Sequence, residues 1–242
     1  MPPAVAHPAL HADAWLGARL RRTAWRIDPA HLDEGCDDLA DALRAEPCFA
    51  SARVSTASPA TVARLNRLGF TTVDTTVTWE REAGAVDADA ADVDVRPATP
   101  ADREAVAAIA ATAFTFDRFH LDPHVDGAVA DRIKRDWASA YFDGTRGQAM
   151  LVGRVDGRVA GFLLVVVPDS ATAIIDLIAT DRAIRRRGVA AAMTATIPRH
   201  VPDVRRLRVG TQVANLPALN AYRRLGFEIV RTEYVLHFHH PG

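Results

Sequence analysis

After residue 92, the pattern of apolar and polar positions alternates between segments typical of strands and segments typical of helices. Short apolar or alternating runs predict strands at 93–97, 149–155, 159–167, 173–179, 207–212 and 228–238. Apolar residues at helical spacing predict helices that begin near Thr99 and at 126–141, 188–197 and 217–225. This order of elements predicts an α/β sandwich that contains a mixed sheet.

Two short motifs support this order of elements. Thr99 and Pro100 form a typical helix start, with a side chain that can cap the helix and a proline in the first turn. Asp156 and Gly157 lie between two apolar runs, which is a strong signal for a β-hairpin. The hairpin places the strands at 149–155 and 159–167 side by side.

The chain before residue 83 looks like a shorter version of the end of the chain. Residues 83–92 are small and acidic without an apolar period, so they predict a linker between domains at 1–82 and 93–242. The segment Arg-Val-Ser-Thr at 53–56 resembles Arg-Val-Gly-Thr at 208–211, and Arg-Leu-Gly-Phe occurs at 67–70 and at 224–227. Either these are two ordinary strand–helix–strand units with a glycine at the helix end, or the first domain is a partial duplicate of the second.

Composition excludes several classes of function. The 242 residues are 49% hydrophobic and 24% charged, and the net charge is −1, which gives no reason to expect a polyanionic partner. Cys36 and Cys48 are too few for a disulfide framework, and their spacing fits no zinc site. Neither a signal segment nor an apolar run long enough for a membrane span occurs, so we expect a cytoplasmic protein.

The sharpest local motif is Arg-Arg-Arg-Gly-Val-Ala at 185–190, between a predicted strand and a predicted helix. The start of a helix presents free N–H groups and a positive dipole, and Gly188 allows a ligand to approach the backbone closely. Arginines add charge that suits phosphates. The motif is neither a Walker loop nor a GxGxxG loop. It predicts a pyrophosphate site, although a solvated basic turn would have the same composition.

A second motif lies downstream. Asn215 precedes a helix that Pro217 begins, and Tyr222 lies inside that helix. A tyrosine here can donate a proton to a leaving thiolate, because transfer between groups with pKa values of roughly 10 and 8.5 is only mildly uphill. Alternatively, Tyr222 is a core residue, since it shares a helix face with Leu219 and Leu225.

The order of these motifs resembles the GNAT superfamily of N-acetyltransferases. The resemblance covers residues 91–239 and, more weakly, 48–82. It implies the GNAT fold, a mixed and mostly antiparallel sheet with flanking helices, preceded by a partial GNAT-like domain. It also implies an acyltransferase in which an amine attacks the thioester of acetyl-CoA directly, with acetyl-CoA as the co-substrate, no acyl-enzyme and no metal.

The resemblance implies a role for individual residues. The CoA pyrophosphate is expected to bind the backbone of Arg185, Arg186, Arg187, Gly188, Val189 and Ala190. The strand at Ile178, Ala179 and Thr180 would pair with the pantetheine arm, and an N–H near Ile178 would stabilise the oxyanion. Asn215 would contact the CoA arm, and Tyr222 would be the general acid.

The first copy of the repeat lacks the residues expected of a CoA site. Leu65 replaces Tyr222 in the first copy, and no Arg-x-x-Gly-x-Ala loop precedes it, so we expect no CoA site in the first domain. That domain either is structural or lines the acceptor site.

Asp176 is a candidate general base, although it can also simply face solvent. A water chain can replace such a base.

The acceptor is expected to contact the segment between the first two helices of the second domain. Residues 116–123 and the later Trp137 resemble the TDP-fucosamine acetyltransferase type, which acetylates an amino sugar on a nucleotide carrier. Arg118 and His120 are therefore candidate contacts for a polar or phosphorylated acceptor. Alternatively, Phe116 and Phe119 anchor the loop and the polar groups lie in water.

Other clusters carry weaker signals. His120, Asp122 and His124 do not complete a recognisable metal site, and a solvated terminal strand is favoured over metal binding for His237 and His239. The arginines near 182–208 have no interleaved aromatic residues, so we expect no nucleic acid partner. A homodimer is compatible with exposed strands in the additional domain.

Three functions follow from the sequence. The first is acetylation of a small-molecule amine, with an amino sugar on a nucleotide carrier as the specific prediction. The second is acetylation of protein or peptide amines, which would require an open groove and acidic residues. The third is a non-catalytic CoA-binding regulatory module, which the presence of Tyr222 and an intact pyrophosphate motif disfavours.

Overall fold

The structure is a computed structural model that describes residues 7–32, 37–84 and 92–241. Its contacts divide the chain into two compact units. The first unit comprises Met1–Thr76, Asp117–Val129 and Arg231–Gly242, and the second comprises Val77–Phe116 and Ala130–Val230. The predicted linker at 83–92 lies mostly outside the described residues, as does Cys36.

The second unit contains a mixed, mostly antiparallel sheet in the order β4-β9-β8-β7-β6-β5. Only the β8–β9 pair is parallel among the pairs whose register is described in this unit. The strands are β4 (Thr71–Glu82), β5 (Asp94–Pro97), β6 (Ala149–Val155), β7 (Arg158–Asp169), β8 (Thr172–Thr180) and β9 (Arg206–Gln212). The helices are α4 (Arg103–Ala113), α5 (Gly127–Ser139), α6 (Val189–His200) and α7 (Leu216–Arg224). The predicted α/β order is confirmed.

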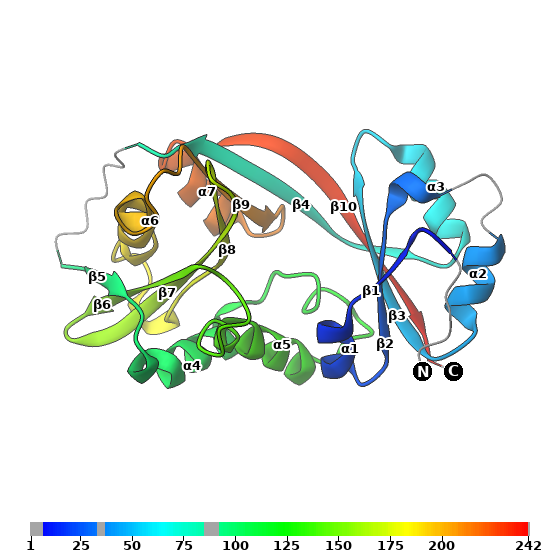
Figure 1. Ribbon diagram of the computed structural model, residues 1–242, viewed down its shortest axis with the longest axis horizontal. Coiled ribbons are helices and arrows are strands. Elements are labelled where there is room, and N and C mark those ends of the chain that lie inside the picture. The colour runs from blue at the N-terminus through cyan, green and yellow to red at the C-terminus, as the bar shows by residue number, and fades with distance from the viewer. Residues whose placement is uncertain (1–6, 33–36, 85–91, 242) are drawn as a thin grey trace. The chain divides into compact units, whose positions relative to one another are not determined.

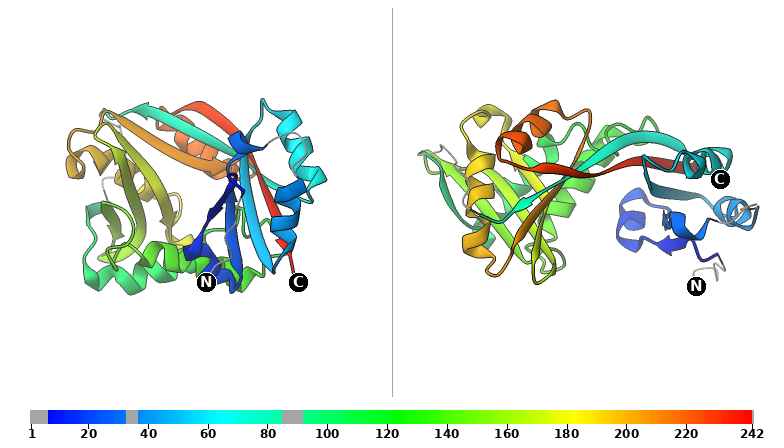
Figure 2. Two further views of the ribbon diagram at one scale, coloured as in Figure 1. Left: turned by 45° about the vertical axis from the view of Figure 1, so that its right-hand side comes forward. Right: turned by 90° about the horizontal axis from the view of Figure 1, so that it is seen from above.

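Alternation along the strands gives this sheet an apolar surface on each face. On one face, Ile109 of α4 and Ala138 of α5 pack with Phe162 and Leu177 of the strands. On the other, Met193 of α6 joins a cluster that includes strand residues. The helices therefore cover both faces, with α4 and α5 on one side and α6 on the other (Figures 1 and 2).

Two glycines hold the first turn of α6 close to the sheet. Gly153 of β6 and Gly161 of β7 face each other across the strand pair. A Cβ at Gly153 would lie 2.8 Å from Cγ1 of Val189, and one at Gly161 would lie 2.7 Å from the carbonyl oxygen of Ala179. A Cβ at Gly161 would also lie 3.0 Å from Cγ1 of Val189, so glycine at both positions lets the first turn of α6 pack closely on the sheet.

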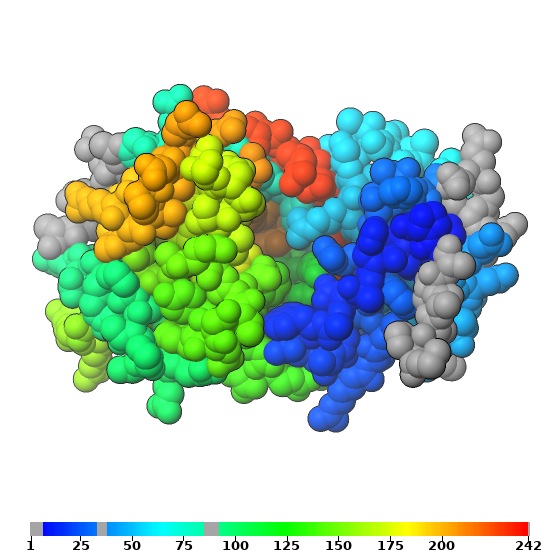
Figure 3. Space-filling model, in the orientation of Figure 1, coloured from blue at the N-terminus to red at the C-terminus, as the bar shows by residue number. Residues whose placement is uncertain are grey.

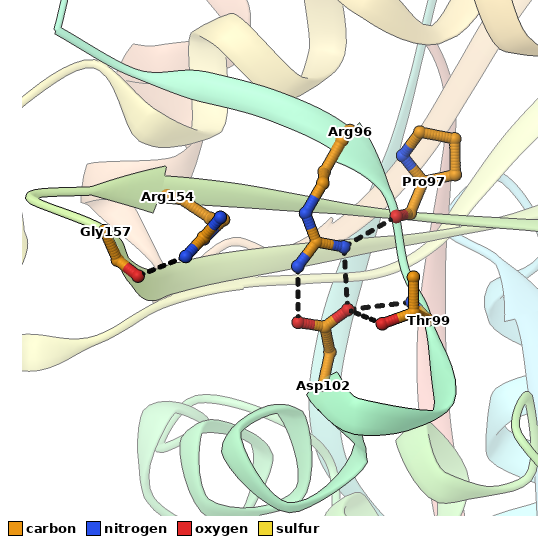
Figure 4. A network of polar contacts seen from close by, with 6 residues as sticks. All are labelled: Arg96, Pro97, Thr99, Asp102, Arg154 and Gly157. Atoms are coloured by element: carbon orange, nitrogen blue, oxygen red, sulfur yellow. Dashed lines mark hydrogen bonds and ion pairs between the residues drawn. The ribbon is translucent and has the colours of Figure 1, made fainter.

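The start of α4 is fixed by a partly buried ion pair. A short 3₁₀ turn (η2, Pro100–Asp102) precedes the helix. The guanidinium of Arg96 in β5 donates two hydrogen bonds of 2.8 Å to Asp102, which also accepts from the backbone N–H and the hydroxyl of Thr99 (Figure 4). Arg96 holds the pKa of the Asp102 carboxyl well below its usual range. This network ties the edge strand to the helix that follows it.

Among the described residues, the first unit contains one run of paired strands and three α-helices. Its strands β1 (Leu10–Ala12), β2 (Thr23–Ile27) and β3 (Cys48–Ser55) are followed in the sheet by β10 (Glu228–His240), in the order β1-β2-β3-β10. The helices are α1 (Ala14–Leu20), α2 (Asp37–Arg44) and α3 (Pro59–Arg67). One sheet face and these helices bury a core that includes Trp25, Leu43, Leu65 and Phe238. Burial raises the pKa of the free thiol of Cys48 to about 11.

The two predicted strand–helix–strand units are both present. They are β3-α3-β4 and β9-α7-β10, and each helix ends at the Leu-Gly-Phe motif. The N–H of Phe70 donates to the carbonyl of Leu65, as the N–H of Phe227 does to that of Tyr222. Leu65 and Tyr222 thus hold equivalent positions. This local likeness supports the predicted duplication, which stays a prediction.

None of the described helices is long and apolar enough to cross a membrane.

Candidate functional site

Strands β8 and β9 separate halfway along their length. Their parallel pairing runs from Thr172–Arg206 to Ile175–Val209 and ends there, whereas β8 continues to Thr180. On its other side, β8 stays paired with β7 as far as Thr180. Within the described chain, residues 176–180 therefore present one backbone edge that no strand occupies. Such an edge accepts an extended ligand as an additional strand does.

A β-bulge interrupts β8 where the strands separate. Leu177 pairs with Leu164 and Ile175 pairs with Val165, so Asp176 is an extra residue without a partner in β7. Bulges next to active sites redirect side chains. The side chain of Asp176 accepts hydrogen bonds from Nε1 of Trp137 at 2.8 Å and from Nε and Nη2 of Arg146 at 2.6 and 2.7 Å.

These contacts bear on the predicted role of Asp176. Its carboxylate is mostly buried, with 13% of the side chain exposed, and both oxygens are already bound by Arg146. The alternative in which Asp176 simply faces solvent is therefore wrong. These three hydrogen bonds use most of the acceptor sites of the carboxylate, so this geometry favours a positioning role, while the predicted role as base stays untested.

After β8 the chain forms a compact loop that ends in α6. A 3₁₀ turn (η3, Arg182–Ile184) follows Asp181, whose side chain caps it. Arg186 has φ 70° and Gly188 has φ 75°, and both lie in the left-handed region. Left-handed residues in such a loop can turn backbone N–H groups outward, where they can bind an anion. Because the first N–H groups of α6 have no acceptor within the helix, they add to this site.

The three arginines of the loop are exposed, and α6 lies at the surface of its unit (Figure 3). Arg187 pairs with Asp156 at 3.2 Å, and Arg185 donates to the carbonyl of Ala113 at 3.4 Å. Among the described residues, the guanidinium of Arg186 has no hydrogen bond or ion pair. The loop therefore combines a backbone anion site with at least one available cation.

Asn215 and Tyr222 are both held by neighbouring residues. The side chain of Asn215 accepts from the N–H of Ala218 at 3.3 Å and donates to the hydroxyl of Thr211 at 3.2 Å, so it caps α7. Tyr222 is buried, with ring centroids 6.4 Å from Trp79 and 5.7 Å from Phe227. Burial raises the pKa of its phenol, which keeps the proton on Tyr222 at neutral pH and makes proton release costlier than in water.

The second unit brings several of the predicted residues together. Val189 and Tyr222 belong to one buried cluster, and Ile178 packs against it. The beginning of α6, the unpaired edge of β8 and the tyrosine of α7 thus share a single apolar support. Arg118 and His120, by contrast, belong to the first unit by their contacts.

In the first unit, the loop after Phe116 lies on the sheet. His120 is hydrogen-bonded through Nδ1 to Asp117, and Arg118 lies with its guanidinium 4.5 Å from the ring centroid of Phe119. Phe119 is buried against Phe49, with ring centroids 6.5 Å apart. Phe119 anchors the loop, as one alternative predicted. Phe116 does not share this role, because it is exposed.

Sequence reasoning missed a buried cluster of Asp122, His237 and His239. The predicted solvated terminal strand is wrong at His237, whose side chain is 0% exposed. One oxygen of Asp122 accepts from Nδ1 of His237 at 2.6 Å and from Nε2 of His239 at 2.8 Å. The alternation of His237 and His239 was visible in the sequence, but their partner lies 115 residues away.

This cluster has the donor set of a metal site, since its three ligand atoms lie within 4.8 Å of one another. However, Nη2 of Arg22 lies 3.0 Å from Nδ1 of His239. Arginine can only donate, so Nδ1 is an acceptor and Nε2 of the neutral ring carries the proton. A metal ion can bind Nε2 only when that nitrogen carries a lone pair in place of the proton. The contacts therefore describe a hydrogen-bonded network and do not favour a metal.

The comparisons with known proteins decide the family. A sequence model described as the acetyltransferase (GNAT) family matches residues 106–227, which is just over half of the 242 residues. The chain belongs to the GNAT acetyltransferase family. The predicted GNAT fold is confirmed, and the predicted enzyme class, an acyltransferase of EC 2.3.1, is the class of this family.

Individual relatives of this GNAT protein are distant. The spore coat polysaccharide biosynthesis protein SpsD of Bacillus subtilis (strain 168) is 29% identical over 144 residues, which is 58% of this chain and 49% of SpsD. The chain thus matches about half the length of that curated relative. The match does not confirm a TDP-fucosamine acetyltransferase.

Solved structures show the same fold at low identity. A GCN5-related N-acetyltransferase from Kribbella flavida superposes with a TM-score of 0.59 at 20% identity and covers 91% of this chain and 81% of its own. A tandem GNAT protein from the clavulanic acid biosynthesis pathway superposes with a TM-score of 0.60 at 18% identity. This match covers 89% of this chain and 75% of that protein's chain.

The GNAT family uses acetyl-CoA, and the residues of the second unit suit that molecule. An unpaired strand edge suits the amide-containing pantetheine arm, and the N–H groups at a helix start, together with arginines, suit a pyrophosphate. The loop at 185–190 and the β8 edge both lie where the family model matches.

Proposed function

We propose that this GNAT protein transfers the acetyl group of acetyl-CoA to a primary amine of a small molecule, specifically an amino sugar on a nucleotide carrier. The observation that carries the proposal is the free edge of β8 beyond Ile175, followed directly by the left-handed turns at Arg186 and Gly188. Together they offer a binding track for a pantetheine arm and its pyrophosphate.

In the proposed reaction, the amine attacks the thioester carbonyl directly. A C–N bond forms as the C–S bond breaks, and a backbone N–H near Ile178 stabilises the oxyanion that develops. Tyr222 donates its proton to the departing thiolate. The attacking amine must lose a proton, which passes to water or to a base. Because Asp176 is bound by Arg146 and Trp137, we propose that it holds the bulge of β8 in place.

The relative with the spore coat polysaccharide name supports a sugar amine as the acceptor. Its name concerns polysaccharide biosynthesis, and it is 29% identical to this chain over 144 residues. We also propose that the first unit is a partial repeat without a CoA site, because Leu65 holds the position of Tyr222 there. The tandem GNAT structure shows that two such folds occur in one chain.

The proposed function is tested by acetyl transfer with purified protein. The assay offers acetyl-CoA with nucleotide-linked amino sugars, free amino sugars, polyamines and a panel of peptides, and mass spectrometry identifies the product. We expect N-acetylation of an amino sugar nucleotide at the highest kcat/KM. Preferred acetylation of peptides would replace this acceptor with a protein substrate. Acetyl-CoA binding without turnover on any amine would support a regulatory module.

A further inference from the structure

One face of the first unit's sheet carries polar side chains where the other face carries the core. His11 pairs with Arg26, Arg26 with Ser51, and Ser51 with His237 across four strands. Residues that are paired across strands share a face, and so does Arg53, two positions after Ser51. This face is the one on which His237 binds Asp122 of the 117–129 loop.

A pocket of about 490 Å³ lies on this face, entirely within the first unit. Its size is within the range of small-molecule sites. Its polar lining comes from His11, Arg26, Asp28, Ser51, Arg53 and Arg118. Three arginines and one carboxylate thus face the same space, which makes the pocket strongly basic although the whole chain has a net charge of −1.

The positive charge in the pocket is not matched by close carboxylates. The half-buried Arg118 makes no hydrogen bond or ion pair with any described residue. Arg26 and Arg53 have their nearest carboxylates, Asp13 and Glu233, at 4.0 Å, the outer limit of an ion pair. Burial and the charge of Arg53 lower the pKa of Arg118 to about 10, although Asp13, Asp74 and Asp117 act in the opposite direction.

The carboxylate in the pocket is already committed to its own turn. Asp28 accepts from the N–H of Ala30 at 3.0 Å and from Nδ1 of His31 at 3.1 Å, where it caps the 3₁₀ turn Pro29–His31 (η1). The 3₁₀ turn therefore uses Asp28 as its cap. The guanidinium groups have hydrogen-bond donors left for a ligand.

Arg118 is also held in place before any ligand arrives. Asp122, four residues later, is fixed by His237 and His239, and Phe119 is buried against Phe49. A cation whose loop is anchored directly after it loses little entropy on binding. A merely solvated basic face would not need such an anchor.

We propose that this pocket binds an anionic oxygen group, a phosphoryl or carboxylate group of the acceptor, through Arg118, Arg53 and Arg26. Planar guanidinium groups match such groups with paired hydrogen bonds. A nucleotide diphosphate is the ligand that this charge favours. In naming the acceptor as the source of the anion, the inference rests on the proposed function. The binding site itself does not.

The test is calorimetry at low salt with saturating CoA, so that the pyrophosphate site of α6 is occupied. Thymidine diphosphate, uridine diphosphate and inorganic pyrophosphate probe for a phosphoryl site, and citrate probes for a carboxylate site. Arg118→Met and Arg53→Met remove charge at similar volume. Arg67→Met, on the exposed surface of α3, is the matched control. Melting temperatures establish that each variant is folded, and Arg118→Lys retains the charge if Arg118→Met does not fold.

We expect at least one anion to bind, with Kd raised about 10-fold or more in Arg118→Met and Arg53→Met, which is about 1.4 kcal/mol, and less than 2-fold in Arg67→Met. Tighter binding of the diphosphates than of citrate identifies a phosphoryl site, and the reverse identifies a carboxylate site. No binding of any anion, or an equal Kd in all variants, would overturn the proposal. If acetyl-CoA binds while every anion fails, only this pocket is wrong. If acetyl-CoA itself fails to bind, the proposed function is wrong.

Discussion

Lowering the pH is expected to destabilise the first unit through His237. Its imidazole is fully buried, donates from Nδ1 to Asp122, and has an Nε2 without a partner in the described chain. A proton on Nε2 would place an unsatisfied donor and a charge in the core. Burial therefore lowers the pKa of His237 to about 4, against an ordinary value of 6.5.

The size of the effect follows from this shift. The unfolded state takes up the proton near pH 6.5 while the folded state rejects it until about pH 4. The free energy of unfolding is then undiminished above pH 6.5, falls as the pH drops toward 4, and loses about 3 kcal/mol in all, at about 1.4 kcal/mol for each unit of pKa shift.

Urea unfolding between pH 7.5 and 4.5 measures this loss. His237→Gln should have a shallower dependence on pH than the wild type by about 2–3 kcal/mol over this range. His31→Gln removes a histidine whose side chain is 51% exposed and hydrogen-bonded to Asp28, and serves as the matched control. Equal pH dependence in the wild type and His237→Gln would refute the reasoning, because the titration would then belong to other groups.

Three further predictions concern the second unit. Gly161→Ala should weaken acetyl-CoA binding and cost about 1–3 kcal/mol in urea unfolding, because its Cβ would lie 2.7 Å from the Ala179 carbonyl; unchanged binding would show that this contact does not position the site. Tyr222→Phe should lower kcat by roughly 10²–10⁴ with little change in the KM for acetyl-CoA, and a kcat within 2-fold of the wild type would remove Tyr222 from the mechanism. Asp176→Asn should lower kcat, because the ion pair with Arg146 that holds the bulge of β8 is lost; a kcat within 2-fold of the wild type would show that this ion pair does not position the site.

Much of the second unit could be predicted from the sequence. The strand at 149–155 has the predicted bounds, and the helix at α6 begins one residue after the predicted Gly188. The period of the apolar residues, the turn residues and the helix caps are local signals, so they specify individual helices and strands well. The loop at 185–190 could be found because its residue types and its place before a helix are contiguous in the chain.

The contacts that link distant segments could not be predicted in this way. Alternation indicates that His237 and His239 share a face, but whether that face is solvated depends on a loop more than 100 residues earlier. Likewise, a lone carboxylate at Asp176 does not reveal that Arg146 binds it. Burial of a polar group is decided by its long-range partners, and a single sequence does not display them.

The most direct test of the account is calorimetry of acetyl-CoA binding to the wild type and to Gly188→Val, with Gly127→Val as the control. Gly188 has φ 75°, which a β-branched residue rarely adopts, whereas an added Cβ at Gly127 meets nothing within 4 Å. We predict that the wild type and Gly127→Val bind acetyl-CoA and that Gly188→Val, still folded by its melting temperature, binds at least 10-fold more weakly. Equal affinity in all three proteins, or no binding by the wild type, would contradict the claim that the backbone at the start of α6 holds the coenzyme.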